Sequence, residues 1–151
     1  MPRLATPDDA EAIARLAART FPLACPPTTT QEDIEAHISG ELNVERFREQ
    51  MATATFLVVD AGDGEVCGYA MIATEPPPID HDWRNPAELR RIYVDADQHG
   101  QGVAASLMRM SLELAAQAGH DWLWLGTNMD NARALRFYGK SGFRIVGERT
   151  F

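Results

Sequence analysis

The sequence has few cysteines and no long hydrophobic run. Its two cysteines, Cys25 and Cys67, form no CxxC pair, and neither has the neighbouring ligands of a zinc site. We therefore expect no metal centre and two structural thiols in a cytoplasmic protein, because stable disulfides are rare in that compartment. No stretch approaches the length of a membrane span, and residues 1–8 hold no apolar core of a signal peptide, so we expect no membrane association.

Positive charge is also scarce. The 151 residues contain 14 Lys and Arg against 22 Asp and Glu, which gives a formal net charge of −8. Nucleic-acid binding normally requires a basic face, so this class of function is disfavoured. An acidic surface attracts cationic substrates through its field, although the same charge also serves solubility. The length and the 45% hydrophobic content fit a single globular domain over residues 1–151.

The first half of the chain carries helical patterns followed by a hairpin pattern. Helices are expected at 7–21, 31–39 and 43–51, and the two strands of the hairpin at 55–60 and 66–72. Thr6 is the expected N-cap of the first helix, Phe21-Pro22 its end, and Gly40 the end of the second. A proline-rich loop follows at 75–86. Long loops of this kind in compact domains are often functional.

Strands and helices alternate in the second half. Strands are expected at 88–94, 122–126 and 143–149, and helices at 103–119 and 132–140. Asn131 can cap the last helix and Gly142 can end it. N-terminal helices, then a hairpin, then a β-α-β-α-β half predict an α/β (α+β) fold with a mixed central sheet.

The segment from Ile92 to Met108 reads as a strand, a glycine loop and a helix. Its first residues are branched and aromatic, as in a buried strand. Gly100 and Gly102 allow a sharp turn and a close approach of the backbone to a ligand. The helix from Val103 presents unpaired N–H groups and the positive end of its dipole. A pyrophosphate cradle and an ordinary strand-to-helix turn both fit this pattern.

Two other phosphate-binding motifs compete for the same glycines. Gly100, Gly102 and Ala105 match the dinucleotide fingerprint G-x-G-x-x-G/A. That fingerprint belongs in the first βα unit of a larger sheet, with an acidic residue ending the next strand, whereas Asp121 precedes a strand here. The Gly-Lys-Ser/Thr of a P-loop is absent. A nicotinamide or nucleoside-triphosphate enzyme is therefore disfavoured.

Three motifs together resemble a known family. They are Glu88–Val94, His99–Ala104 and Asn131–Phe143, and their order and spacing resemble the GNAT superfamily of acetyl-coenzyme A-dependent N-acetyltransferases over most of the chain. The family's loop pattern, Gln/Arg-x-x-Gly-x-Gly/Ala, falls on His99, Gly102 and Ala104, with histidine in place of the usual Gln or Arg. The resemblance implies the GNAT fold and acetyl-CoA as cosubstrate.

The resemblance also implies a coenzyme site. Backbone N–H groups from about Gly100 to Ala104 would hold the pyrophosphate, and Ile92 and Val94 would pair with the pantetheine arm like an added strand. The expected coenzyme-binding residues are Ile92, Tyr93, Val94, His99, Gly100, Gln101, Gly102, Val103, Ala104, Asn131 and Lys140. A helix cap is the alternative interpretation of Asn131, and a solvated helix face that of Lys140.

Acetyl transfer to an amine requires a base, a donor to the developing oxyanion and an acid for the leaving thiolate. Glu88, at the start of its strand, is the candidate base, with a solvated strand end as the alternative. The backbone N–H of Val94 is the candidate oxyanion donor. Tyr138 matches the tyrosine general acid of the family, and the alternative is an inward-facing core residue beside Leu135.

The sequence leaves alternatives for the acceptor amine and for the oligomeric state. The motif at Glu88–Val94 and the N-terminal helices look most like the bacterial polyamine (spermidine/spermine) N-acetyltransferases, which implies a small primary amine as acceptor. A protein N-terminus, a lysine side chain, an aminoglycoside and a coenzyme-A sensor without turnover are the alternatives. The family fold continues past the strand at 143–149 with one more strand. This predicts either further chain after Phe151 or a homodimer that supplies the strand.

Overall fold

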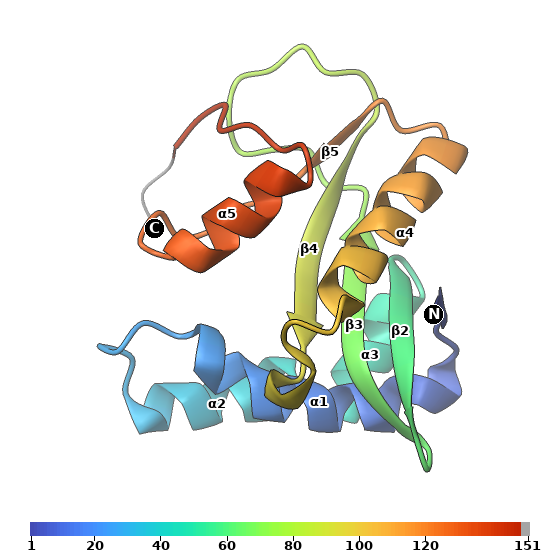
Figure 1. Ribbon diagram of the computed structural model, residues 1–151, viewed down its shortest axis with the longest axis vertical. Coiled ribbons are helices and arrows are strands. Elements are labelled where there is room, and N and C mark those ends of the chain that lie inside the picture. The colour runs from blue at the N-terminus through green and yellow to red at the C-terminus, as the bar shows by residue number, and fades with distance from the viewer. Residues whose placement is uncertain (149–151) are drawn as a thin grey trace.

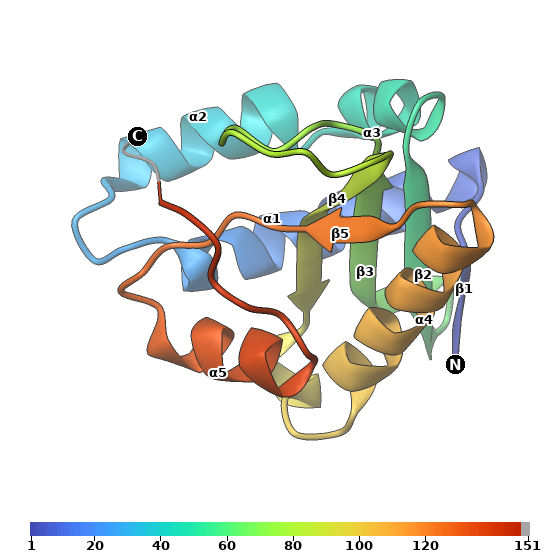
Figure 2. The same cartoon turned by 90° about the horizontal axis from the view of Figure 1, so that it is seen from above.

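The computed structural model describes residues 1–148. Its strands are β1 Pro2–Leu4, β2 Thr55–Gly62, β3 Glu65–Ala73, β4 Pro86–Val94 and β5 Trp122–Trp124. Its helices are α1 Ala10–Ala24, α2 Gln31–Glu41, α3 Val44–Met51, α4 Val103–Gln117 and α5 Ala132–Lys140. Figures 1 and 2 show a central sheet with α1–α3 on one face and α4 and α5 on the other. The predicted α+β class and mixed sheet are confirmed.

The strands follow one another across the sheet in the order β1-β2-β3-β4-β5. Neighbours from β1 to β4 are antiparallel, whereas β5 runs parallel to β4. The parallel pair arises because α4 forms a crossover between the two strands, which a short turn could not do. β5 pairs only with Pro86, Ala87 and Glu88. Among residues 1–148, the rest of β4, as far as Val94, therefore has an open edge on the side of β5.

The register shows which backbone groups lie on this open edge. The N–H of Asp95 donates to the carbonyl of Cys67 at 2.8 Å, and Val94 lies opposite Gly68. Hydrogen-bonded and non-hydrogen-bonded pairs alternate along an antiparallel ladder. Val94 and, two residues earlier, Ile92 therefore belong to the non-hydrogen-bonded pairs. Their N–H and C=O groups point away from β3 and toward the open edge.

Two apolar layers hold the helices on the sheet. On one face, α1 and α3 bury Ile13, Leu16 and Phe47 against Phe56 and Tyr69. On the other face, the fully buried residues include Leu57, Ala70, Leu89, Leu107 and Met108. The spacing of Ile13, Leu16 and Thr20 is helical, so one stripe of α1 faces the sheet.

Gly68 allows α4 to lie directly against β3. A Cβ atom at this position would lie 3.0 Å from Leu107 Cδ1 and 3.0 Å from Val103 Cγ1, closer than side chains normally pack. Because Val103 is the first residue of α4, this contact fixes where the helix begins. Gly68 thus positions the N-terminus of α4 beside the end of β4.

Several predicted boundaries were wrong. β1 was not predicted, since its three residues have no recognisable pattern of their own and pair with β2 through contacts distant in sequence. Phe21-Pro22 does not end the first helix, which continues to Ala24 with Pro22 in its last turn, and Gly40 lies inside α2. The predicted buried strand 122–126 is only Trp122–Trp124, and Trp122 is 40% exposed.

The sequence predicted a strand at 143–149, but residues 143–148, the described part of this segment, form no strand. Residues 143–148 form no ladder, although Gly142 (φ +101°) ends α5 as expected. Arg149 lies outside the described residues. The outer edge of the three-residue strand β5 therefore pairs with no described strand.

None of the helices in residues 1–148 is both long enough and apolar enough to cross a membrane. In the same part of the chain, no group of three or more His, Cys, Asp or Glu side chains is placed to hold a metal ion.

Candidate active site

The connection from β4 to α4 is a glycine loop that ends at the N-terminus of α4. Gly100 (φ +82°) and Gly102 (φ +81°) adopt the left-handed conformation, and Gly102 is the N-cap of α4. The first helical hydrogen bond runs from Ser106 N–H to Gly102 O at 3.0 Å. The N–H groups of Val103 and Ala104 precede that bond and point out of the helix end. A Cβ at either glycine would meet no atom within 4 Å, so the space over the loop is open.

His99 takes a different role from the Gln or Arg of the family pattern. Its Nε2 lies 3.1 Å from the carbonyl oxygen of Val94 and donates to it when that nitrogen carries the proton. This contact holds the ring against the end of β4. It also confirms that the Val94 carbonyl faces away from β3, as the register requires.

The three predicted residues of β4 divide between the two faces. Ile92 and Val94 pack on the α4 side and present their backbone at the open edge. Tyr93 lies on the opposite face, where its ring is 5.7 Å from the ring of Tyr69. By the alternation above, the backbone of Tyr93 pairs with β3. Tyr93 can therefore line the site only with its side chain.

Tyr138 reaches this region from α5. Its ring packs against Phe143 at 6.0 Å and joins the apolar layer under α4. Burial, and to a smaller extent the nearby Tyr93, raise the pKa of the Tyr138 hydroxyl above its ordinary value of 10.0. Tyr138 is therefore a half-buried side chain whose hydroxyl is protonated at neutral pH, as a general acid requires.

Glu88 lies where β5 diverges from β4. It pairs with Trp124, the last residue of β5, and its side chain is 14% exposed, so the solvated strand end is wrong. Its Oε1 accepts from Arg90 Nη2 at 2.8 Å and from Nε at 2.9 Å. The ladder passes from Met71–Arg91 to Ile72–Leu89, which leaves Arg90 as a bulge residue. Bulges re-aim side chains next to active sites.

The remaining predicted contacts lie at the edges of the cradle. Asn131 caps α5, because its Oδ1 accepts from Ala134 N–H at 3.1 Å. Lys140 is exposed in the last turn of α5. The N–H of Gln101 donates to Gln98 O at 3.2 Å, which closes the turn before Gly102. The cap interpretation of Asn131 is thus confirmed, while the coenzyme contacts of all three stay predictions.

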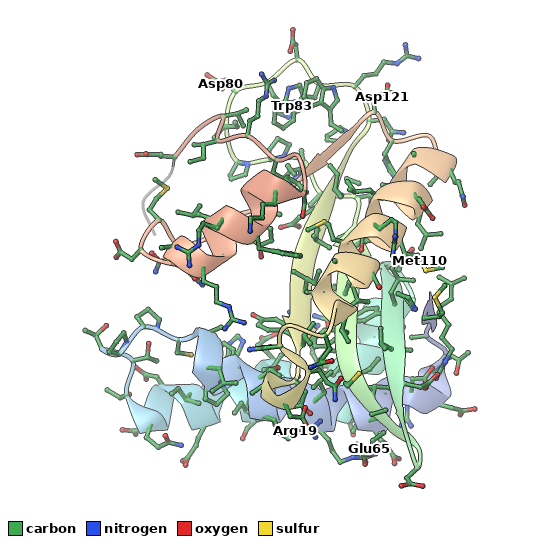
Figure 3. The ribbon with its side chains drawn as sticks, in the orientation of Figure 1. Arg19, Glu65, Asp80, Trp83, Met110 and Asp121 are labelled. Atoms are coloured by element: carbon green, nitrogen blue, oxygen red, sulfur yellow. The ribbon has the colours of Figure 1, made fainter. Side chains whose placement is uncertain are left out.

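Sequence reasoning missed the ion pair that holds the loop. Arg19 Nη2 of α1 donates to Asp95 Oδ2 at 2.9 Å, directly after β4 (Arg19 is labelled in Figure 3). The two residues are 76 positions apart. No local pattern signals such a pair, so only the fold reveals it.

A cavity of about 700 Å³ lies between β5 and residues 143–148. Its walls are mainly apolar and include Trp83, Trp122 and Tyr138. The rings of Trp83 and Trp122 stack at 4.6 Å, which fixes the loop before β4 over β5. The cavity is thus bordered by the same tyrosine.

Comparison with known proteins identifies the family. Residues 11–143 match the Acetyltransferase (GNAT) family. The chain belongs to this family. It is 43% identical over 144 residues to an uncharacterised N-acetyltransferase of Mycobacterium tuberculosis, covering 95% of this chain and 88% of that protein. This GNAT protein is accordingly an acetyl-CoA-dependent N-acetyltransferase.

Solved structures share the fold at low sequence identity. The PaiA N-acetyltransferase of Thermoplasma acidophilum in complex with coenzyme A has a TM-score of 0.85 and 18% identity, over 99% of this chain and 92% of that one. An aminoglycoside N-acetyltransferase in complex with CoA has a TM-score of 0.70 and 17% identity, over 100% of this chain and 91% of that one. The open glycine loop and free strand edge described above fit such a coenzyme.

Proposed function

We propose that this GNAT protein acetylates a small primary amine, most suitably a polyamine, by direct attack with Tyr138 as general acid. The observation that carries the proposal is the position of the Tyr138 hydroxyl. It is protonated at neutral pH, and its half-buried side chain belongs to the same apolar cluster as Ile92 and Val94 of β4, whose open edge leads to the glycine loop. If Tyr138 had only a packing role in the core, it would need neither the glycine loop nor the open edge of β4 nearby.

The coenzyme would bind along this edge. The N–H groups of Gly100 to Ala104 would hold the pyrophosphate, since a helix N-terminus stabilises negative charge. Ile92 and Val94 would pair with the amides of the pantetheine arm, as an extended segment adds to a sheet edge. Asn131 and Lys140 would border the coenzyme from α5, where the exposed Lys140 ammonium would meet a phosphate.

The chain's own groups would then serve one group transfer, in which a C–N bond forms and the thioester C–S bond breaks. Val94 N–H, free of the β3 ladder, would donate to the developing oxyanion. Tyr138 would give its proton to the departing thiolate sulfur. Each role uses a group that faces the open edge or the space beside it.

Glu88 is the proposed base. It lies at the end of the open edge farthest from the glycine loop, where β5 leaves β4, and it is shielded from bulk solvent. In the free protein its carboxylate is occupied by Arg90. An incoming ammonium would compete with Arg90 for this carboxylate, and the proton would pass to it directly or through a water molecule.

Charge supports a cationic acceptor. The formal net charge of −8 raises the local concentration of polycations, an effect that salt screens. Acidic side chains such as Asp80 also lie on the loop that precedes β4, at the Glu88 end of the sheet (Figure 3). These features favour a polyamine over a neutral or acidic acceptor.

Free-thiol release from acetyl-CoA tests the proposal across an amine panel. We expect turnover with spermidine and spermine, and a rise in their KM between low and high salt. Turnover only with a lysine peptide, a peptide N-terminus or an aminoglycoside would contradict the polyamine assignment and keep the chemistry. Tight coenzyme binding without turnover of any amine would contradict the enzyme hypothesis and favour a coenzyme-A sensor.

We further propose that the protein forms a homodimer through the outer edge of β5. Open edges invite strand pairing, and exposed apolar side chains such as Met129, Ile145 and Val146 lie in the same part of the molecule. Sedimentation equilibrium at micromolar concentration is expected to give the mass of two chains. A single-chain mass throughout the concentration range would contradict the dimer.

A further inference from the structure

Asp95 is a junction between β4, the glycine loop and α1. Its N–H donates to Cys67 O of β3 at 2.8 Å, and its carbonyl accepts from Gln98 N–H at 2.9 Å within the loop. Its carboxylate accepts from Arg19 of α1 at 2.9 Å. All three polar groups of the residue are thus used. The loop leaves the sheet in a direction that these contacts define.

The negative charge near Asp95 would repel the anionic ligand proposed for the loop. Asp95 and Asp97 place two carboxylates between the end of β4 and Gly100, in the loop proposed to accept an anionic pyrophosphate. Arg19 lies against the first of them, with its side chain 43% exposed and that of Asp95 24% exposed. The Arg19 guanidinium therefore offsets negative charge at the loop, and its ion pair with Asp95 also holds the loop in place.

We propose that Arg19 is a positioning residue for the coenzyme: its ion pair with Asp95 holds the β4–α4 loop in the conformation that binds pyrophosphate. The inference rests on the proposed coenzyme site. Arg19 acts through Asp95 and needs no contact with the reacting atoms. Its contribution should appear in the KM for acetyl-CoA and leave kcat unchanged.

The chain provides a matched control one helical turn earlier. Arg15 of α1 forms a similar exposed pair with Glu65, also at 2.9 Å, with the side chains 49% and 41% exposed. Glu65 begins β3 and lies at the hairpin, remote in sequence from the glycine loop (labelled in Figure 3). Loss of either pair should affect folding stability similarly, but only Arg19 bears on the loop.

The test compares Arg19→Gln, Arg19→Lys and Arg15→Gln by steady-state kinetics and thermal unfolding. We expect Arg19→Gln to raise the acetyl-CoA KM about two- to fivefold, the range of an exposed pair, with kcat within about twofold. Arg19→Lys should recover most of this loss, because one donor suffices for the single hydrogen bond. Arg15→Gln should leave the KM unchanged.

A double variant separates the pair from an independent effect. If Arg19 acts through Asp95, the Arg19→Gln/Asp95→Asn protein should show no larger KM than the greater of the two single variants. Additive increases, or equal KM changes in Arg15→Gln and Arg19→Gln, would overturn the inference. If Gly102→Ala weakens coenzyme binding while Arg19→Gln does not, the coenzyme site stands and only the role of Arg19 fails.

Discussion

Replacing Tyr138 with phenylalanine is expected to lower kcat about 100-fold or more, the contribution typical of a positioned general acid. The ring would remain packed against Phe143, so folding and the KM for acetyl-CoA should change little. Removal of the hydroxyl leaves the departing thiolate without its proton donor. Steady-state thiol release at saturating amine measures the loss directly.

Tyr69→Phe provides the control for this experiment. It makes the same chemical change on β3, where the buried hydroxyl has no hydrogen-bond partner among the described residues. Removing an unpaired buried hydroxyl is close to neutral for stability, and kcat should be unaffected. A loss of rate in Tyr138→Phe no larger than in Tyr69→Phe would contradict the acid role.

The pH dependence of kcat provides a second test of the Tyr138 hydroxyl as the general acid. Because the pKa of Tyr138 is raised above its ordinary value of 10.0, the hydroxyl stays protonated below that pH. Only the protonated form can donate, so the alkaline fall in kcat caused by Tyr138 should have its midpoint above pH 10.0. Tyr138→Phe should lack this fall, and a fall that persists in the variant belongs to another group.

Gly102→Ala is expected to raise the KM for acetyl-CoA about tenfold. The left-handed conformation at φ +81° costs an L-residue about 1–2 kcal/mol, which the chain can relieve by rotating the loop. Such a rotation would turn the N–H groups of Val103 and Ala104 away from the pyrophosphate. Calorimetric titration with coenzyme A should show the same loss, because no chemistry is involved.

Gly119→Ala is the matched control for Gly102. Gly119 has a similar φ of +88° and lies just after α4, at the end opposite to the loop. Its substitution should lower the melting temperature by a similar amount without changing coenzyme affinity. Equal losses of affinity in both variants would show that strain in α4, and not the cradle, is responsible.

The parts of the site that the sequence predicted depend on local chemistry. Gly100 and Gly102 mark a turn that other residues adopt only with strain, and the helical pattern after Val103 marks the helix whose N-terminus faces that turn. The cap formed by Asn131 is local in the same way. Such features follow from neighbouring residues and need no knowledge of the fold.

The parts that were missed depend on contacts distant in sequence. Arg19 meets Asp95 across 76 positions, and β1 exists only because β2 lies beside it. Glu88 was expected to begin its strand, whereas β4 begins at Pro86, and the pair of Glu88 with Arg90 follows from a bulge that no propensity scale predicts. α1 continues to Ala24 past the break expected at Pro22, although the proline removes one i→i−4 hydrogen bond from the last turn.

Amide NMR of the ¹⁵N-labelled protein, titrated with coenzyme A, tests the central assignment most directly. The account predicts that the largest shifts occur at Gly100, Gly102, Val103 and Ala104, with further shifts at Ile92 and Val94 on the open edge of β4. Large shifts confined to Trp83 and Trp122, around the apolar cavity beyond β5, with the glycine loop unchanged, would contradict it.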